Sequence, residues 1–340
     1  MKSAMKKTAI TLLLTAIMMG SSIAWAGKRL KMPEFLRPGD KVALLSMSCR
    51  PGDVSTIDSA AQVLRSWGYV PVIGQHAKDL WHGYAGTPEQ RLADIMQALR
   101  DPSVKAILSS RGGYGSANVL TLLPTDTLKK YPKWIIGYSD ITGYLSAEVC
   151  AGNMAIHANM GGHLAETGGT DYQSQVLRHL LQGQLPSYDN LPAHPYNHTG
   201  TATGIVIGGN MSVYGDLAGS PYDFLNDKFL KGRNIILFIE DVGESYMKMD
   251  RMLQYLRLRG VLGKLKGLIV GRCAECDPNN GWPDIPTMFH QYLKEMPAGI
   301  PICYDFPTGH DESWNYPLIE GCPATLTVTP AGVSLKFTKH

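Results

Sequence analysis

The stretch VKAILSSRGGYGSANVL (Val104–Leu120) decides the fold class. It begins as an apolar run of strand character, continues as a loop with three glycines and ends in a segment of helical spacing. A strand, a short loop and a helix in this order form one half of a βαβ unit. The glycine loop could cradle a phosphate or could present a serine on a sharp turn. These two uses predict different proteins, and the rest of the chain is needed to choose between them.

The first half of the chain alternates between two kinds of segment. Strands are expected at 41–47, 70–74, 104–110 and 133–140, and helices at 56–68 and 87–100. The second helix has a clear start, because Thr87 can cap it, Pro88 suits its first turn and Gln90 completes a capping box. Alternating strands and helices predict an α/β fold with a mainly parallel sheet.

The alternation breaks at residues 184–203, a segment rich in Pro, Asn, Gly and Thr with little periodicity. It is predicted to be a linker between an N-terminal α/β domain at 27–183 and a smaller C-terminal domain at 204–340. The second domain shows apolar strand-like runs at 204–210, 234–240 and 267–272 and a closing hairpin at 324–337. We therefore expect a mixed α/β structure in the second half.

Residues 1–26 have the pattern of a secretory signal peptide: a basic start, an apolar stretch and a small-x-small ending at Ala24-Trp25-Ala26. An uncleaved anchor is the alternative, although the apolar run is short for a membrane span. The three lysines of this leader account for the whole formal net charge of +3, so the remaining chain is near neutral. We expect export, with a periplasmic location, no stable membrane insertion after cleavage and no nucleic-acid partner.

Six cysteines follow the leader, and two of them form the pair Cys273-Ala-Glu-Cys276. This spacing suits a metal site or a redox pair, but no second pair accompanies it. A local disulfide or plain buried thiols are the other interpretations. We expect no metal and no cofactor.

The glycine loop does not match a phosphate-binding motif. Asn118 stands where a dinucleotide fingerprint needs its third glycine, and no Lys-Ser or Lys-Thr follows the glycines. Ser116 fits the role of a nucleophile, because a serine between a strand and a helix is exposed on a turn and lies at a helix N-terminus. The alternative is that Ser116 only caps the helix.

A serine nucleophile needs a base, and the base needs an orienting partner. His310 follows an apolar stretch and a glycine in a polar loop, and Glu240 ends the apolar run IILFIE. Open α/β sheets place their sites at the carboxyl ends of strands. An exposed loop histidine and a solvated strand end remain the plainer interpretations of these two residues.

Six segments in this order resemble the LD-carboxypeptidase family of serine peptidases: ILSSRGGYGSANVL, WIIGYSDIT, GIVIGGNMS, LFIEDVGESYMKMDRML, GLIVGR and DFPTGH. The resemblance covers nearly the whole chain after the leader. It implies an N-terminal nucleophile-elbow domain, a smaller C-terminal domain and a Ser-Glu-His triad formed by Ser116, Glu240 and His310. It further implies oxyanion donors at Ala117 and at Gly112 or Gly113. It also allows a homodimer.

The resemblance implies removal of the terminal D-alanine from a murein tetrapeptide through an acyl-enzyme. Arg111 is expected either to bind the substrate carboxylate or to brace the loop, and Tyr114 is expected to contact substrate. Tyr138, Ser139 and Asp140 are expected to be structural supports. The alternatives are an immunity-type peptidase that cleaves a peptide–nucleotide antibiotic and a non-catalytic peptide-binding protein. The chain departs from the family where it has His157-Ala158-Asn159 in place of His-Gly-Pro.

Overall fold

A six-stranded sheet organises the N-terminal half of the chain in the computed structural model, which describes residues 29–277, 281–311 and 314–339. The expected signal peptide at 1–26 lies outside these residues. The strands run in the order β11-β5-β4-β3-β1-β2. Their bounds are β1 Lys41–Leu45, β2 Val70–Ile73, β3 Val104–Ser109, β4 Trp134–Gly137, β5 Ala155–His157 and β11 Leu318–Glu320. The first five are parallel, and β11 pairs with β5 in the antiparallel direction.

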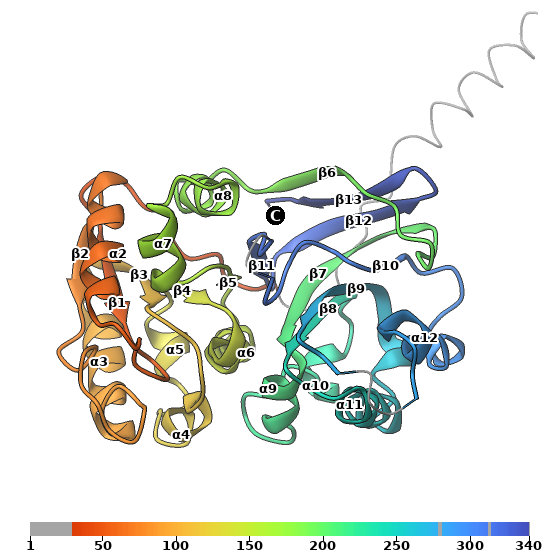
Figure 1. Cartoon of the computed structure of the whole chain (residues 1–340), viewed down its shortest axis with the longest axis horizontal. Coiled ribbons are helices and arrows are strands. Elements are labelled where there is room, and N and C mark those ends of the chain that lie inside the picture. Colours follow the sequence, from red (N-terminus) through yellow and green to blue (C-terminus); the bar gives the residue numbers. More distant parts are fainter. Residues whose placement is uncertain (1–28, 278–280, 312–313, 340) are drawn as a thin grey trace, which may run out of the picture.

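Helices cover both faces of this sheet (Figure 1). Val42 and Leu44 of β1 point into one hydrophobic cluster, and the alternate residues Ala43 and Leu45 point into the other. A strand with two buried faces is apolar along its length, which is why these strands show no alternation in the sequence. The first cluster includes α2 (Ser55–Ser66), α7 (Gly161–Thr167) and α8 (Tyr172–Leu181), and the second includes α3 (Pro88–Arg100), α4 (Ser116–Leu120), α5 (Thr127–Lys130) and α6 (Thr142–Ala151).

A seven-stranded mixed sheet organises the second half, in the order β10-β9-β8-β7-β12-β13-β6. Its strands are β6 Ser187–Leu191, β7 Gly200–Asn210, β8 Ile235–Val242, β9 Leu265–Ala274, β10 Ile302–Cys303, β12 Pro323–Thr329 and β13 Gly332–Phe337. Strands β7 to β10 are parallel, and β12, β13 and β6 continue the sheet with antiparallel pairs. The helices of this half are α9 Met211–Asp216, α10 Asp227–Leu230, α11 Tyr246–Leu258 and α12 Ile285–His290, with the short 3-10 turns η2 Leu262–Lys264 and η3 Leu293–Glu295. A further 3-10 turn, η1 Ser139–Ile141, lies in the first half between β4 and α6.

The expected fold class is confirmed, with two differences in how the chain is divided. The segment expected as a linker contains strand β6, which pairs with β13 at the edge of the second sheet. Strand β11 comes from the C-terminal half of the chain but extends the N-terminal sheet. Neither strand has a sequence signal of its own, because β11 is three residues long and β6 alternates only weakly with its polar neighbours.

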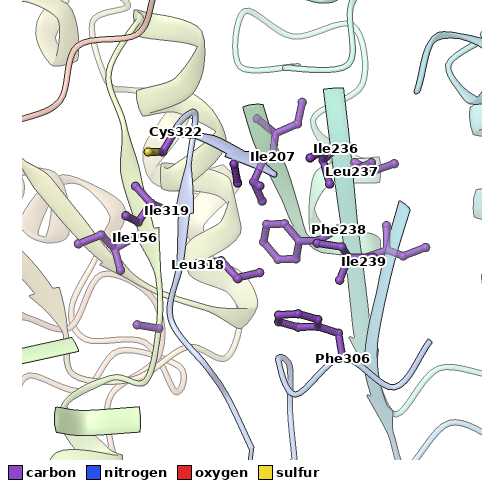
Figure 2. Close-up of a cluster of buried hydrophobic side chains, with 14 of the residues drawn as sticks. Ile156, Ile207, Ile236, Leu237, Phe238, Ile239, Phe306, Leu318, Ile319 and Cys322 are labelled. Atoms are coloured by element: carbon purple, nitrogen blue, oxygen red, sulfur yellow. The ribbon is translucent and has the colours of Figure 1, made fainter. Parts of the chain in front are cut away.

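Strand β11 lies between the two sheets in the centre of the molecule (Figure 1). Figure 2 shows Ile319 beside Ile156 of the first sheet, while Leu318 lies toward Phe238 of the second. All four side chains are fully buried. The hydrophobic cluster is therefore continuous across the two halves, and it fixes the ends of β4 and β8 relative to each other. Among the described residues no helix has the length and apolar character needed to cross a bilayer.

Strand β11 also buries a carboxyl group, that of Glu320, which is 0% exposed. Burial raises the pKa of Glu320 well above its ordinary value of 4.5. The folded protein then binds a proton that the unfolded chain releases above pH 4.5, so this residue contributes stability below that pH which is lost as the pH rises.

We predict that Glu320→Gln removes this dependence. The free energy of unfolding of the wild type should fall more steeply between pH 5 and pH 8 than that of the variant, as measured by urea denaturation. Glu166→Gln, at an exposed glutamate, controls for the loss of a surface charge. Parallel pH profiles for the wild type and Glu320→Gln would contradict the burial of an uncharged carboxyl.

Candidate active site

A buried Glu–His pair lies at the carboxyl end of the second sheet. Glu240, near the end of β8, is 0% exposed, and its Oε2 accepts a hydrogen bond from His310 Nδ1 at 2.6 Å. The loop that carries His310 runs beside β9, where Gly309 bridges to Arg272. Gly309 has a φ of +123°, and a Cβ there would lie 3.0 Å from the Glu240 Cβ. A glycine is thus required for the histidine loop to approach the carboxylate.

The electrostatics of this pair suit a general base. Burial disfavours the charged imidazolium, but the Glu240 carboxylate outweighs that effect and raises the pKa of His310 above 6.5. Because Nδ1 donates to Glu240, Nε2 is the nitrogen left to accept a proton. His310 Nε2 has no hydrogen-bond partner within the described part of the chain. It is free to take a proton from a nucleophile.

An asparagine pair supports the histidine loop from below. The Oδ1 of Asn315 accepts the Gly309 N–H at 3.1 Å and lies 3.1 Å from His157 Nε2, while its amide donates to Asn159 Oδ1 at 2.9 Å. Burial lowers the pKa of His157 to about 4, so this histidine is neutral. The position at which the chain departs from His-Gly-Pro therefore has a defined partner, because Asn159 binds the segment that follows His310.

Ser116 is not placed next to His310. It is only 1% exposed, and its Oγ donates to Asp140 Oδ1 at 3.0 Å while its N–H donates to Asp140 Oδ2 at 2.8 Å. A Cβ on Gly143 would lie 2.7 Å from the Ser116 Oγ, which shows that the hydroxyl points into helix α6. Asp140 thus caps helix α4 through Ser116. This geometry argues against Ser116 as the nucleophile. It also differs from the expected cap, because Gly115 is the N-cap of α4 and Ser116 is the first residue of the helix.

Ser139 has the geometry that a nucleophile elbow requires. It lies two residues after the end of β4, and its φ is +62°, a left-handed conformation that is uncommon for serine. The 3-10 turn η1 and helix α6 follow directly. The ring of the preceding residue, Tyr138, lies 4.8 Å from that of His310 between centroids. A sharp strand-to-helix turn with a part-exposed serine therefore directly follows a tyrosine that packs against the ring of His310.

The residues expected to supply oxyanion N–H groups do not all lie near one serine: Gly112 lies near Ser139, whereas Ala117 follows Ser116. Gly112 lies against Ser139, because a Cβ on Gly112 would be 2.9 Å from the Ser139 Cβ. Gly113 follows with a φ of +110°. Ala117 comes after Ser116 in α4. The N–H of Asp140, in the first turn of η1, is the one that directly follows Ser139, and N–H groups at a helix start have no partner within the helix.

The two predicted substrate contacts lie on the surface of the glycine loop. Arg111 is exposed, and its Nη1 donates to the carbonyl of Arg50 at 3.4 Å, which supports the bracing role. Tyr114 is 57% exposed. It lines the cavity described next, and Arg111 does not.

A cavity of about 300 Å³ lies between the two halves of the molecule, and both serines line it. The C-terminal half contributes an acidic wall that includes Asp216, Asp241 and Glu244. Burial raises the pKa of Asp241 to about 6 despite hydrogen bonds from Ser212. No group of three potential metal ligands occurs among the described residues.

From the sequence, Ser139 is expected to be a structural support. The available signal was the apolar run Trp134–Gly137 followed at once by Tyr-Ser-Asp and a helix, which is a strand–turn–helix unit like that of the glycine loop. The glycines favour the first of these two similar loops, and the φ of +62° that distinguishes Ser139 cannot be seen in a sequence.

Comparison with known proteins agrees with the fold. Models of the LD-carboxypeptidase N-terminal and C-terminal domains match residues 42–158 and 203–326. The chain is 33% identical over 291 residues to a putative carboxypeptidase from Synechocystis, covering 83% of this chain and 90% of that one. It is 30% identical over 258 residues to the murein tetrapeptide carboxypeptidase of Pseudomonas aeruginosa, covering 72% and 80%.

Solved structures share the fold. A muramoyltetrapeptide carboxypeptidase from Oxalobacter formigenes superposes with a TM-score of 0.76 at 24% identity, covering 88% of this chain and 99% of that one. An MccF-like protein from Bacillus anthracis gives 0.79 at 25% identity, covering 91% and 99%. The family models and the curated relatives identify a serine carboxypeptidase. The chain belongs to the LD-carboxypeptidase family.

We predict that Glu240→Gln lowers kcat/KM by about 10²- to 10⁴-fold, because His310 loses its charged orienting partner. The acid limb of the pH–rate profile, which reports His310, should also move to lower pH, since the Glu240 charge raises the pKa of His310. Rates measured from pH 5 to pH 9 test both effects. An unchanged limb in a folded variant would mean that His310 does not titrate in catalysis.

Proposed function

We propose that this protein removes the terminal D-alanine from murein tetrapeptide stems, with Ser139 as nucleophile, His310 as base and Glu240 as its orienting group. One observation carries the proposal: a serine at a φ of +62° follows β4, next to a tyrosine whose ring touches that of His310. The relatives named as murein peptide carboxypeptidases support the choice of substrate.

In the proposed mechanism, His310 Nε2 takes the proton of the Ser139 hydroxyl as the oxygen attacks the carbonyl carbon of the scissile amide. The N–H groups of Asp140 and of Gly112 or Gly113 stabilise the negative charge that develops on the carbonyl oxygen. His310 then donates its proton to the departing amine of D-alanine. Water, activated by the same histidine, attacks the acyl-enzyme and releases the shortened peptide.

A second candidate is cleavage of a peptide–nucleotide antibiotic by the same residues. It is favoured by the MccF and MccF-like structural neighbours, because this chain aligns with almost the whole length of each of them. A peptide-binding role without catalysis does not explain why a buried carboxylate orients a histidine that keeps one nitrogen free. We further propose that the chain is exported to the periplasm, which rests on the leader-like pattern of residues 1–26.

The nucleophile is tested by comparing Ser139→Ala with Ser116→Ala. Each protein is incubated with a purified disaccharide-tetrapeptide, and loss of one alanine is followed by mass spectrometry. We predict that Ser139→Ala loses activity by roughly 10⁴-fold or more, because no oxygen remains to form the acyl-enzyme. Ser116→Ala should stay within about tenfold of the wild type but unfold more easily, by about 1–3 kcal/mol, since a buried hydrogen bond to Asp140 is lost.

The opposite ranking of the two variants, with both folded by circular dichroism, would restore Ser116 as the nucleophile. If the wild type leaves the tetrapeptide unchanged, an aminoacyl sulfamoyl adenosine is the second substrate to try. Cleavage of that compound alone would support the immunity-type activity with the same residues. A failure of both substrates would leave the binding role.

A further inference from the structure

The two cysteines of the Cys-x-x-Cys segment lie together in a tight turn at the end of β9. Cys273 is paired with Asp241 across the β8–β9 ladder, and Cys276 follows after Glu275, whose φ is +55°. The two thiols lie close enough to shift each other's pKa, and both are part-exposed. A left-handed residue between the two cysteines turns the chain back, which brings the two side chains to the same turn.

The turn is held by backbone bonds to the segment after Glu240. The Gly243 N–H donates to the Ala274 carbonyl at 2.9 Å, the Asp277 N–H to the Glu244 carbonyl at 3.0 Å and the Tyr246 N–H to the Asp277 carbonyl at 3.0 Å. Glu244 belongs to the wall of the cavity that contains Ser139. The cysteine turn is therefore bonded to the segment that forms this wall of the cavity.

The two thiols are not equivalent. The hydrogen bond from Cys273 lowers the pKa of Cys276, and an N–H at Glu244 acts in the same direction. The same contact and burial raise the pKa of Cys273. A thiolate is the species that attacks a disulfide, so Cys276 is the thiol prepared to react first.

A small oxidant can reach the pair. Cys273 and Ala274 line a second cavity of about 310 Å³, on which Tyr246 and Arg272 also border. The other four cysteines lie elsewhere in the described structure. Burial raises the pKa of three of them, Cys150, Cys303 and Cys322, to about 12, and Cys49 is a single thiol in the glycine-loop region.

We propose that Cys273 and Cys276 are a redox-active dithiol that a low-molecular-weight disulfide converts to an intramolecular disulfide, with Cys276 as the attacking thiol. The Cys276 thiolate attacks one sulfur of glutathione disulfide, whose S–S bond breaks to release one glutathione thiolate. Cys273 then loses its proton, and its sulfur attacks Cys276, which releases the second glutathione. Two electrons pass from the protein to the oxidant, and the two leaving thiolates take up the two protons.

The test is mass spectrometry of the folded protein after incubation in glutathione buffers, followed by alkylation and peptide mapping. The wild type should yield a peptide linked between Cys273 and Cys276, with two fewer alkylated thiols and no bound glutathione at this site. Cys273→Ser should stop at a stable mixed disulfide on Cys276, because the second thiol is missing. Cys276→Ser should leave Cys273 without bound glutathione, because burial still raises the pKa of the Cys273 thiol.

Cys49→Ser is the matched control, because it removes a single thiol and should leave the linked peptide unchanged. The proposal is overturned if the wild type keeps both thiols reduced in oxidising buffer, or if it stops at a mixed disulfide as Cys273→Ser does. Glutathione bound to Cys273 in Cys276→Ser would reverse the assigned order of attack. None of these measurements depends on carboxypeptidase activity, so the result stands apart from the proposed function.

Discussion

The hydrogen bond between Glu240 and His310 is the constraint on which the active-site end of the structure depends. A carboxylate with no exposed surface is costly unless a partner compensates its charge, and His310 supplies that partner at 2.6 Å. The segments next to this pair leave room for it to form. Gly271 and Gly309 leave no Cβ where the histidine loop crosses β9 and approaches the carboxylate. The loop is then fixed by Asn315, so the free nitrogen of the imidazole has a defined direction.

A Glu–His pair needs a nucleophile, and the proposed one comes from the other half of the chain. Strand β11 holds the two halves in a fixed position relative to each other. It comes from the C-terminal half of the chain but pairs with β5 of the first sheet. Its residues Leu318 and Ile319 are buried between the two sheets. His157, at the end of β5, packs edge-on against Phe238 of β8 at 5.0 Å between centroids. These contacts bring the end of β4, where Ser139 lies, next to the end of β8. Catalytic groups from separate sheets are thus positioned by apolar packing rather than by direct bonds between them.

Much of the fold could be predicted because it depends on local patterns. The apolar runs and the Thr87–Gln90 capping box belong to single segments, and the structure has both. Strand β11 could not be predicted, because two apolar residues and a glutamate acquire strand structure only from a partner far away in the sequence. Glu240 and His310 were identifiable from residue type, strand position and family resemblance. The choice between Ser116 and Ser139 could not be made in this way, since it depends on a backbone dihedral and on the direction of a hydroxyl, which residue identity does not show.

Asp140 explains why two serines compete for the same interpretation. Its carboxylate accepts hydrogen bonds from Ser116 and from Ser48, while its backbone directly follows Ser139. The Asp140 side chain therefore connects helix α4 and the loop after β1 to Asp140 itself, whose N–H is a proposed oxyanion donor. The glycine loop approaches Ser139 from the other side through Gly112. Ser116 therefore contributes to this region through its hydrogen bonds to Asp140. In the proposed assignment it positions an oxyanion donor while Ser139 reacts.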